Sequence, residues 1–413
     1  METLKFEQIE LLILIGAIVA LIARRLKIPY TVGLVLAGIL MAVLPLEIEL
    51  NFSKELLFKV LLPPLIFEAA LYIDWKELRK DLLPIVTYAT VGVLLSAFVT
   101  AAIMHFAVGW TWQAAILFGV LIAATDPVSV IATFKEAKVK GRLRLLVEAE
   151  SLFNDSTAAV AFAIALAFAL GEKLSLTGSL RLMLVSVVGG IVSGLLVGGL
   201  ATILIGRTKD NLVELAMTTL AAFGSFWLAE HFHLSGILAT TTAGLLVGNM
   251  TAFGIFSHKG EKSVSHFWDF AAFVVNSIIF IVLGLNVAYQ SFAKAFMAII
   301  VAIIAVIIAR AVAVYPTSAL FARSSWKIER SHQHILFWGG LRGALALALA
   351  LGIPSDLPYY KEILTVTFGV VAFSVFVQGL TITPLLQLLG QISDNNGDTE
   401  KVSENSAKTN VAD

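Results

Sequence analysis

The sequence predicts an all-α integral membrane protein, and three of its features favour this class. Of the 413 residues, 58% are hydrophobic and 14% are charged, whereas a globular domain has about 45–50% apolar and about 25% charged residues. The apolar residues form long blocks along nearly the whole chain, and basic residues cluster between alternate blocks. A soluble core cannot bury so many apolar residues, so lipid must surround much of the chain.

Thirteen apolar blocks are candidates for membrane spans, each of which needs roughly 17–25 residues. The first block follows several glutamates, whereas a signal peptide begins with basic residues and ends at a cleavage site, so we expect a retained span. A short polar tail, residues 391–413, is expected to be disordered and cytoplasmic. The blocks cover residues 9–23, 29–45, 55–73, 82–108, 112–134, 143–170, 175–206, 210–230, 235–250, 264–287, 292–322, 331–353 and 360–390.

Lys and Arg residues are concentrated in every second loop between these blocks. If the N-terminus lies outside, all of these loops face the inner side, as the positive-inside rule requires. A different number of spans would disturb this alternation. The sequence therefore predicts thirteen spans, with the N-terminus outside and the C-terminus inside. The basic clusters lie at residues 24–27, 76–80, 135–144, 207–209, 259–262 and 323–330.

Thirteen spans divide into six, one and six, which is the plan of transporters built from two inverted repeats. Within a transmembrane domain of residues 1–390, repeat 1 covers about 9–170, a linker helix about 175–206, and repeat 2 about 210–390. The fifth span is interrupted at Asp126-Pro127, since proline lacks a backbone donor and disfavours helix in the preceding residue. Glycines interrupt the twelfth span at 338–343. Broken helices at matched positions predict that spans 5 and 12 cross at a transport site near the midplane.

A few ionisable residues lie deep within the blocks, where each costs at least about 2.5–3.5 kcal/mol and is expected to be functional. They are Asp126, Glu150, Asp155, Arg310 and Arg342. Arg310 stays protonated and needs a permanent acidic partner, for which we choose Glu150 in a structural ion pair. Asp155 is then left free to titrate. Arg342 lies in the second break, where it can balance Asp126 or cap exposed carbonyl groups.

The sixth span contains a polar stripe within Glu150–Asp155. Its four polar residues lie three or four positions apart and share one helix face, while Leu152 and Phe153 face away. Carboxylate, amide and hydroxyl oxygens suit a hard cation, and the broken fifth span adds Thr125 and Asp126. A carboxylate in a low-dielectric interior is most stable when neutralised, either by a proton or by a cation. Competition for Asp155, our first choice, would therefore exchange the two.

Other polar residues have simpler interpretations. Ser151 is explained as well by a contact between helices as by ion binding. Glu68, Glu148 and Asp269 lie near the ends of spans, where solvation or snorkelling is the default. Asn276 lies in the middle of a span and fits either a helix contact or the lining of a cavity.

Four segments of the sequence resemble one known family. Ala124–Val130 and Glu150–Asp155 are similar to the paired signature of the NhaP-type and eukaryotic Na⁺/H⁺ exchangers of the cation:proton antiporter superfamily. Leu62–Glu68 and Gly339–Gly343 resemble two further stretches of that family. The likeness runs in order through the membrane portion, about residues 1–390.

The resemblance implies a homodimer of thirteen-span subunits in the cell membrane, exchanging Na⁺ for H⁺ by alternating access. The Asn154-Asp155 pair, in place of two adjacent aspartates, implies the electroneutral branch with one cation for one proton. The short tail suggests a prokaryotic member. The implied ion site has Na⁺ at Asp155, Asp126, Thr125 and Ser151, with Asn154 and Glu150 nearby and Glu150 paired with Arg310.

Several other functions are weighed against this one. A K⁺/H⁺ antiporter of the same fold stays open, as does transport of Li⁺, because these ions also take oxygen ligands. A cation channel fits less well, because a channel needs several weak sites along a continuous pore. An intramembrane enzyme is not expected, since the chain lacks cysteine and none of its seven histidines forms an H-E-x-x-H motif. The balanced charge gives no reason to expect nucleic acid, and beyond the transported ions and membrane lipid no cofactor is expected.

Overall fold

The computed structural model describes residues 6–26, 28–44, 54–126, 128, 130–131, 134, 139, 141–172, 175–251 and 254–392, and this part of the chain contains helices and no strands. Short π-helical segments, Leu57–Leu61, Tyr88–Gly92, Met104–Val108 and Ser374–Gln378, adjoin some of the α-helices. The α-helices are α1 (Phe6–Leu26), α2 (Tyr30–Val43), α3 (Lys54–Leu56), α4 (Leu62–Leu71), α5 (Trp75–Thr87), α6 (Val93–Ile103), α7 (Trp112–Leu121), α9 (Arg142–Ala169), α10 (Leu176–Ile205), α11 (Asn211–His231), α12 (Gly236–Thr251), α13 (His258–Tyr289), α14 (Phe292–Leu320), α15 (Arg330–Trp338), α16 (Ala344–Leu351), α17 (Tyr360–Phe373) and α18 (Gly379–Leu388).

Seven helices of the described chain are long and apolar enough to cross a membrane. One face of α10 shows how they meet lipid, since Leu184, Val188 and Leu196 are each more than half exposed. Shorter apolar helices occur at Tyr30–Val43, Trp112–Leu121 and Gly236–Met250. The seven candidates are Trp75–Val108, Arg142–Ala169, Thr177–Ile205, Asn211–His231, Lys259–Tyr289, Phe292–Leu320 and Tyr360–Leu388.

Helix is present in each of the thirteen predicted blocks, but several helices begin earlier than predicted. Helix α5 starts at Trp75 rather than near residue 82, because the side chain of Asp74 accepts hydrogen bonds from the backbone N–H groups of Lys76 and Glu77. Hydropathy marks only the apolar part of a helix, whereas an N-cap of this kind fixes where the helix begins. The predicted disorder of the tail concerns residues that, beyond Ile392, lie outside the described part of the chain.

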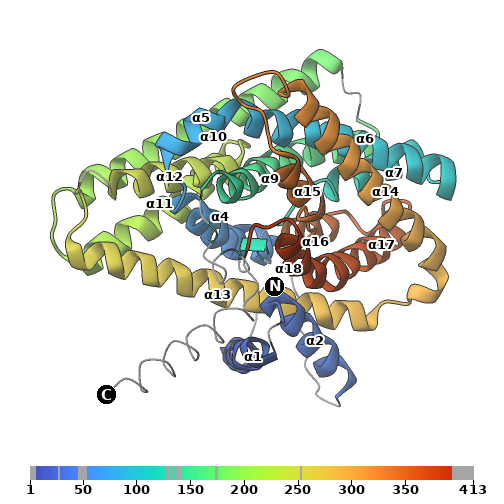
Figure 1. The fold of residues 1–413 in the computed structure, drawn as a ribbon, viewed down its shortest axis with the longest axis horizontal. Coiled ribbons are helices and arrows are strands. Elements are labelled where there is room, and N and C mark those ends of the chain that lie inside the picture. Colours follow the sequence, from blue (N-terminus) through green and yellow to red (C-terminus); the bar gives the residue numbers. More distant parts are fainter. Residues whose placement is uncertain are drawn as a thin grey trace, which may run out of the picture.

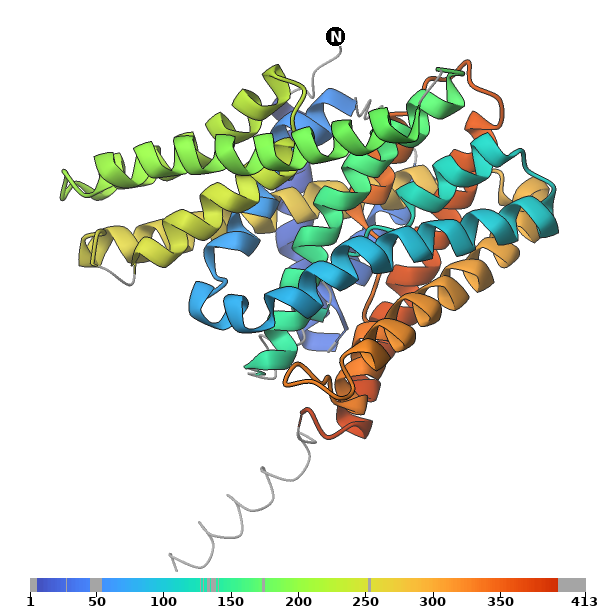
Figure 2. The same cartoon turned by 90° about the horizontal axis from the view of Figure 1, so that it is seen from above.

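The helices form two groups on either side of a central region. Helices α10, α11 and α12 pack against one another, and α12 also packs against α4. Helix α14 packs against α6 and α17, and α6 packs against α7. Figures 1 and 2 show α10 in green extending to one side and α6, α7 and α14 in cyan and orange on the other, with α9 and α16 between them.

Helix α13 is fixed against α2 by a close backbone contact. A Cβ atom at Gly38 would collide with the backbone carbonyl of Ile281, and one at Gly284 would collide with that of Val35. Small residues allow helices in membranes to approach this closely. The contact makes α2 and α13 one rigid unit, which forms a wall of the site described below.

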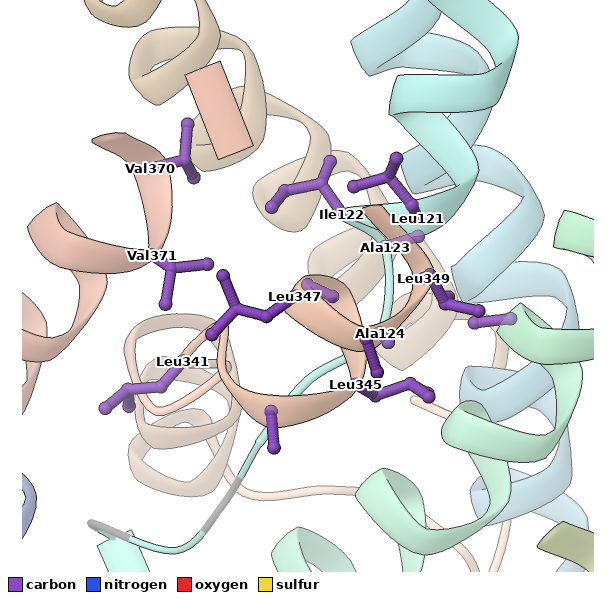
Figure 3. Packing of buried hydrophobic residues seen from close by; sticks show 14 of the residues in the cluster. Leu121, Ile122, Ala123, Ala124, Leu341, Leu345, Leu347, Leu349, Val370 and Val371 are labelled. Carbon is purple, nitrogen blue, oxygen red and sulfur yellow. The ribbon is translucent and has the colours of Figure 1, made fainter. Parts of the chain in front are cut away.

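Two helices are broken at the predicted places. Helix α7 ends at Leu121, and Ala124–Asp126 are not helical. Helix α15 ends at Trp338, and α16 begins at Ala344 after a non-helical stretch. Figure 3 shows residues 121–124 beside Leu345 and Leu349 of α16. Pro127, to which the sequence assigned the first break, lies outside the described residues.

Candidate cation site

The two broken segments meet through their backbones. The N–H group of Asp126 donates a hydrogen bond of 2.8 Å to the carbonyl oxygen of Leu341. A backbone group freed by a helix break would be costly at membrane depth without such a partner. The first break therefore supplies a hydrogen-bond donor to a carbonyl group of the second break, although more than 200 residues of sequence separate them.

Charged side chains from each break compensate the helix end of the other. The guanidinium of Arg342 donates hydrogen bonds of 2.6 and 2.9 Å to the carbonyl oxygens of Ala123 and Ala124, after the C-terminal end of α7. The carboxylate of Asp126 accepts bonds of 3.0 and 3.2 Å from the N–H groups of Val128 and Ala344. Ala344 is the first residue of α16. A cation near carbonyl groups and an anion at a helix N-terminus both lower the energy of the broken helices.

This arrangement decides between the two roles predicted for Arg342. In the described residues its side-chain hydrogen bonds go to carbonyl groups, so Arg342 caps the broken helix. Its own N–H group donates to the hydroxyl of Ser374 at 2.8 Å, and that hydroxyl donates to Gln378 at 2.7 Å. Gln378 in turn donates to the carbonyl of Trp338. No local pattern marks Ser374 and Gln378, because the backbone groups of Arg342 and Trp338 that they bind lie more than 30 residues away in the chain.

Glu150 and Arg310 form the ion pair that the sequence predicts. The two guanidinium nitrogens Nη1 and Nη2 of Arg310 donate to the carboxylate oxygens of Glu150 at 2.9 and 3.0 Å. Arg310 also donates to the carbonyl of Leu336 on α15. Both side chains are buried. A bidentate pair with further hydrogen bonds is the form in which a buried ion pair is stable.

Asn154 connects this ion pair to the broken α7 segment. Its amide donates to Glu150 Oε1 at 3.1 Å and to the hydroxyl of Thr125 at 2.5 Å. Its Oδ1 accepts from the N–H group of Thr125 at 3.2 Å. The amide is fully buried and bonded at both ends, so Asn154 fixes Thr125 rather than facing open space.

A pocket of about 240 Å³ lies beside these residues. The polar residues predicted to bind the ion form two sets, one that lines the pocket and one that does not. Asp155, Asp126, Thr125 and Ser151 line the pocket, whereas Glu150 and Asn154 are not among its described lining residues. Ser151 donates a hydrogen bond to the carbonyl of Thr125, which leaves the lone pairs of its hydroxyl oxygen for a further ligand.

Asp155 differs from the other two deep acids. Its Oδ1 atom is buried and has no hydrogen-bond partner in the described part of the chain. Within the same part of the chain, no three His, Cys, Asp or Glu side chains gather as they do at a transition-metal site. The pocket can therefore offer a small cation one uncommitted carboxylate oxygen together with hydroxyl and carbonyl oxygens, which suit a hard ion.

The pocket also contains residues to which the sequence assigned simpler roles. Glu68, Glu148 and Asp269 line it, together with Asn276, so their positions near span ends do not place them away from the site. Leu152 lines it too, which corrects the prediction that it faces away. The missed signal is helical spacing, since residues 151, 152 and 155 lie three, four and seven positions after residue 148.

A second pocket adjoins the first. This second pocket, of about 550 Å³, shares Glu148 and Asp269 with the first. It also contains Asp74, Glu77 and Arg144, which belong to segments that the basic loops assign to the inner side. Arg144 forms an ion pair of 2.7 Å with Glu148. Acidic groups thus line both pockets, and an acidic lining favours the approach of cations.

A multi-pass helical protein with two crossed broken helices and a buried, uncommitted carboxylate belongs to the class of membrane transporters. The comparisons with known proteins specify the family. Residues 11–388 match the model of the family described as sodium/hydrogen exchanger, transmembrane. The chain belongs to this family, whose members are secondary transporters rather than enzymes.

Individual relatives are similar over most of their length. The chain is 38% identical to the Na⁺/H⁺ antiporter ApNhaP of Aphanothece halophytica, over 89% of this chain and 71% of that protein. It is 33% identical to the Na⁺/H⁺ antiporter NhaH of Halobacillus dabanensis, over 94% and 98%. The solved structure of the sodium proton antiporter MjNhaP1 from Methanocaldococcus jannaschii superposes with a TM-score of 0.75 over 92% and 98%, at 21% identity. This last comparison shows a common fold.

Proposed function

We propose that this chain exchanges Na⁺ for H⁺ across the cell membrane, and that Asp155 holds either ion. The observation that carries the proposal is that Asp155 lines the pocket and that its buried Oδ1 atom has no hydrogen-bond partner among the described residues. An isolated carboxylate in such a place is stabilised by any cation that neutralises it. Because a proton and Na⁺ would compete for the same oxygen, binding of one releases the other.

The same geometry supports a stoichiometry of one Na⁺ for one H⁺. Glu150 is neutralised by Arg310, and both carboxylate oxygens of Asp126 accept backbone hydrogen bonds. Only Asp155, among the three deep acids, then changes its charge during a cycle. One titrating group can carry either one proton or one monovalent cation, so the exchange is electroneutral. K⁺ remains the alternative ion, because it too takes oxygen ligands.

The proposed architecture has thirteen spans in two inverted repeats, with the N-terminus outside and the C-terminus inside. Its support is the position of the two breaks, one in the fifth and one in the twelfth predicted span, and the alternation of the basic loops. Broken helices that cross near the midplane suit alternating access, in which the site opens to one side at a time. The family resemblance further implies a homodimer in a prokaryotic cell membrane.

The test uses purified protein in liposomes with an imposed pH gradient. Addition of Na⁺, Li⁺ or K⁺ in turn should dissipate the gradient, with Na⁺ effective at the lowest concentration. Asp155→Asn should abolish the response to every ion, because an amide can neither release a proton nor balance a cation. Electrical recording on the same vesicles should detect no net current during exchange.

The control is Asp356→Asn, which removes a carboxylate from an exposed loop and should leave exchange unchanged. Retained Na⁺-driven proton flux in a folded Asp155→Asn protein would reject the assignment of the site. A response to K⁺ but not to Na⁺ would show that K⁺, rather than Na⁺, is the transported cation. A current with each turnover would overturn the one-for-one stoichiometry.

A further inference from the structure

One wall of the candidate site comes from α13, to which the proposed exchange assigns no role. Asp269, Ala272, Phe273 and Asn276 of this helix line the same pocket as residues of the polar stripe of α9. Their spacing of three, four and seven positions places them on one helix face. Asn276 is thus the uncharged polar member of that face, two turns of helix beyond Asp269.

The side-chain oxygen of Asn276 resembles Oδ1 of Asp155 in its burial and in its lack of a hydrogen-bond partner. Its Oδ1 atom is buried and has no hydrogen-bond partner in the described residues. A few other buried side-chain atoms there also lack partners, but those of Asp155 and Asn276 are the two that belong to residues lining this pocket. A buried polar atom without a partner is costly, and a missing ion or water is a common explanation.

The residues around Asn276 fix the position of its helix, but none of the described ones forms a hydrogen bond with its Oδ1 atom. The hydroxyl of the next residue, Ser277, donates to the carbonyl of Phe273 and shares a hydrogen bond of 2.6 Å with the hydroxyl of Tyr30. The rings of Tyr30 and Phe273 stack with centroids 5.4 Å apart. Together with the Gly38–Gly284 contact, these interactions fix α13 against α2, and Asn276 stays among the residues that line the pocket.

We infer that Asn276 is a ligand of the transported cation, supplying its Oδ1 from α13. The inference rests on the proposed function, since it assigns a further ligand at the same site. A cation bound between them would satisfy both unpartnered oxygens at once. An amide oxygen coordinates Na⁺ without adding charge, so the one-for-one exchange at Asp155 is preserved.

This role would also connect ion binding to the arrangement of the helices. Helix α9 packs mainly against α5 and α7, whereas α13 packs against α1, α2, α4 and α11. A cation shared by Asp155 and Asn276 would join these two sets of helices through its oxygen ligands.

The test measures the KM for Na⁺ and the maximal rate of exchange separately, in proteoliposomes at a fixed pH. Asn276→Ala should raise the KM for Na⁺ about tenfold, as expected for the loss of one good contact to an ion, and should change the maximal rate by less than about twofold. Asn276→Asp keeps an oxygen at the same position and should retain a KM near that of the wild type. If Asn276→Ala does not fold, Asn276→Thr can be measured in its place. The shorter threonine side chain moves the oxygen away from the pocket and should raise the KM for Na⁺ by the same factor.

The matched control is Asn286→Ala on the same helix. Asn286 is partly buried like Asn276, but its amide donates to the carbonyl of Val282 and it lies outside the pocket lining. Its variant should keep the wild-type KM. Equal KM values in the Asn276→Ala and Asn286→Ala proteins, or an equal loss of rate in Asn276→Ala and Asn276→Asp, would overturn the inference.

The same measurements separate this inference from the proposed function. A wild-type protein without Na⁺-driven proton flux, or an active Asp155→Asn variant, would reject the function itself. Wild-type flux with an unchanged KM in Asn276→Ala would reject only the role of Asn276. Stabilisation of the purified protein by NaCl relative to choline chloride gives an independent measure, and Asn276→Ala should reduce this shift in melting temperature.

Discussion

Asp126, Glu150 and Asp155 are acids of one small region, Glu150 buried and the two aspartates partly buried, and their partners give each a different role. Glu150 is neutralised by a guanidinium, whereas the carboxylate of Asp126 accepts hydrogen bonds from the N–H groups of Val128 and of Ala344, the first residue of α16. Asp155 keeps an unpartnered oxygen. A carboxylate that is already neutralised gains little from a cation, so residue type alone does not identify the exchanging group.

The ion pair of Glu150 and Arg310 should contribute to stability rather than to ion choice. Arg310→Ala leaves the carboxylate of Glu150, whose residue is 3% exposed, without its cation, and removing one partner of such a pair costs about 3–5 kcal/mol. We expect a markedly lower melting temperature of the purified protein in detergent. The relative response to Na⁺, Li⁺ and K⁺ should stay the same in whatever protein remains folded.

Two further variants sharpen this test. Arg323→Ala removes an exposed arginine and should leave the melting temperature within about 1 °C, since exposed charges contribute little. Replacing Glu150 and Arg310 together with methionine should recover much of the lost stability, because an apolar pair of similar volume leaves no buried charge. An unchanged melting temperature for Arg310→Ala would show that the pair does not stabilise the fold.

At the scale of elements, the crossing of the broken helices depends on charges exchanged between them. Arg342 lies beside the last carbonyl groups of the α7 segment, and Asp126 lies at the first N–H group of α16. Each helix end thus obtains the charge that its dipole favours. Glycine at position 343 makes this possible, because a Cβ atom there would overlap the carboxylate of Asp126.

Gly343→Ala should therefore disturb the crossing. The added methyl group displaces the carboxylate of Asp126, so the N–H group of Ala344 loses its partner at membrane depth. We expect the exchange rate in proteoliposomes to fall at least tenfold, together with a lower melting temperature. Gly199→Ala on α10 is the control, since its Cβ would meet only a side chain at 3.9 Å, and it should be neutral or slightly stabilising.

At the scale of the whole molecule, a polar site lies between two groups of apolar helices whose outer faces meet lipid. The basic loops predict the orientation of this assembly, because Lys and Arg tend to be retained on the inner side of the membrane. The second pocket, which opens beside Asp74 and Glu77, would then lead to the cytoplasm. The orientation thus decides from which side the site is reached in this structure.

The absence of cysteine from the sequence permits a direct test of orientation. Lys209→Cys and Lys294→Cys each introduce a single thiol at an exposed position. A membrane-impermeant maleimide should label the first only in inside-out vesicles and the second only in right-side-out vesicles. Detergent-solubilised protein, in which both should react, is the control. Labelling of both from the same side would contradict the predicted orientation.

The sequence by itself determined the class of protein, the places where two helices break and the identity of the deep charges. These properties depend on composition and on neighbours within a few residues, such as the spacing within Glu150–Asp155. They were accessible because lipid makes every charged or helix-breaking residue at membrane depth costly, so each one stands out. The pairing of Glu150 with Arg310 followed from the same cost.

Only the tertiary structure decided how these groups are used. It placed Thr125, Ser151, Asp126 and Asp155 on the pocket and put Glu150 and Asn154 behind it. It also brought Asn276 to the same pocket and made Arg342 a cap for carbonyl groups of α7. The physical reason is that a hydrogen bond or a pocket joins atoms from segments more than 100 residues apart, and helical periodicity gives the face of one helix without its partner.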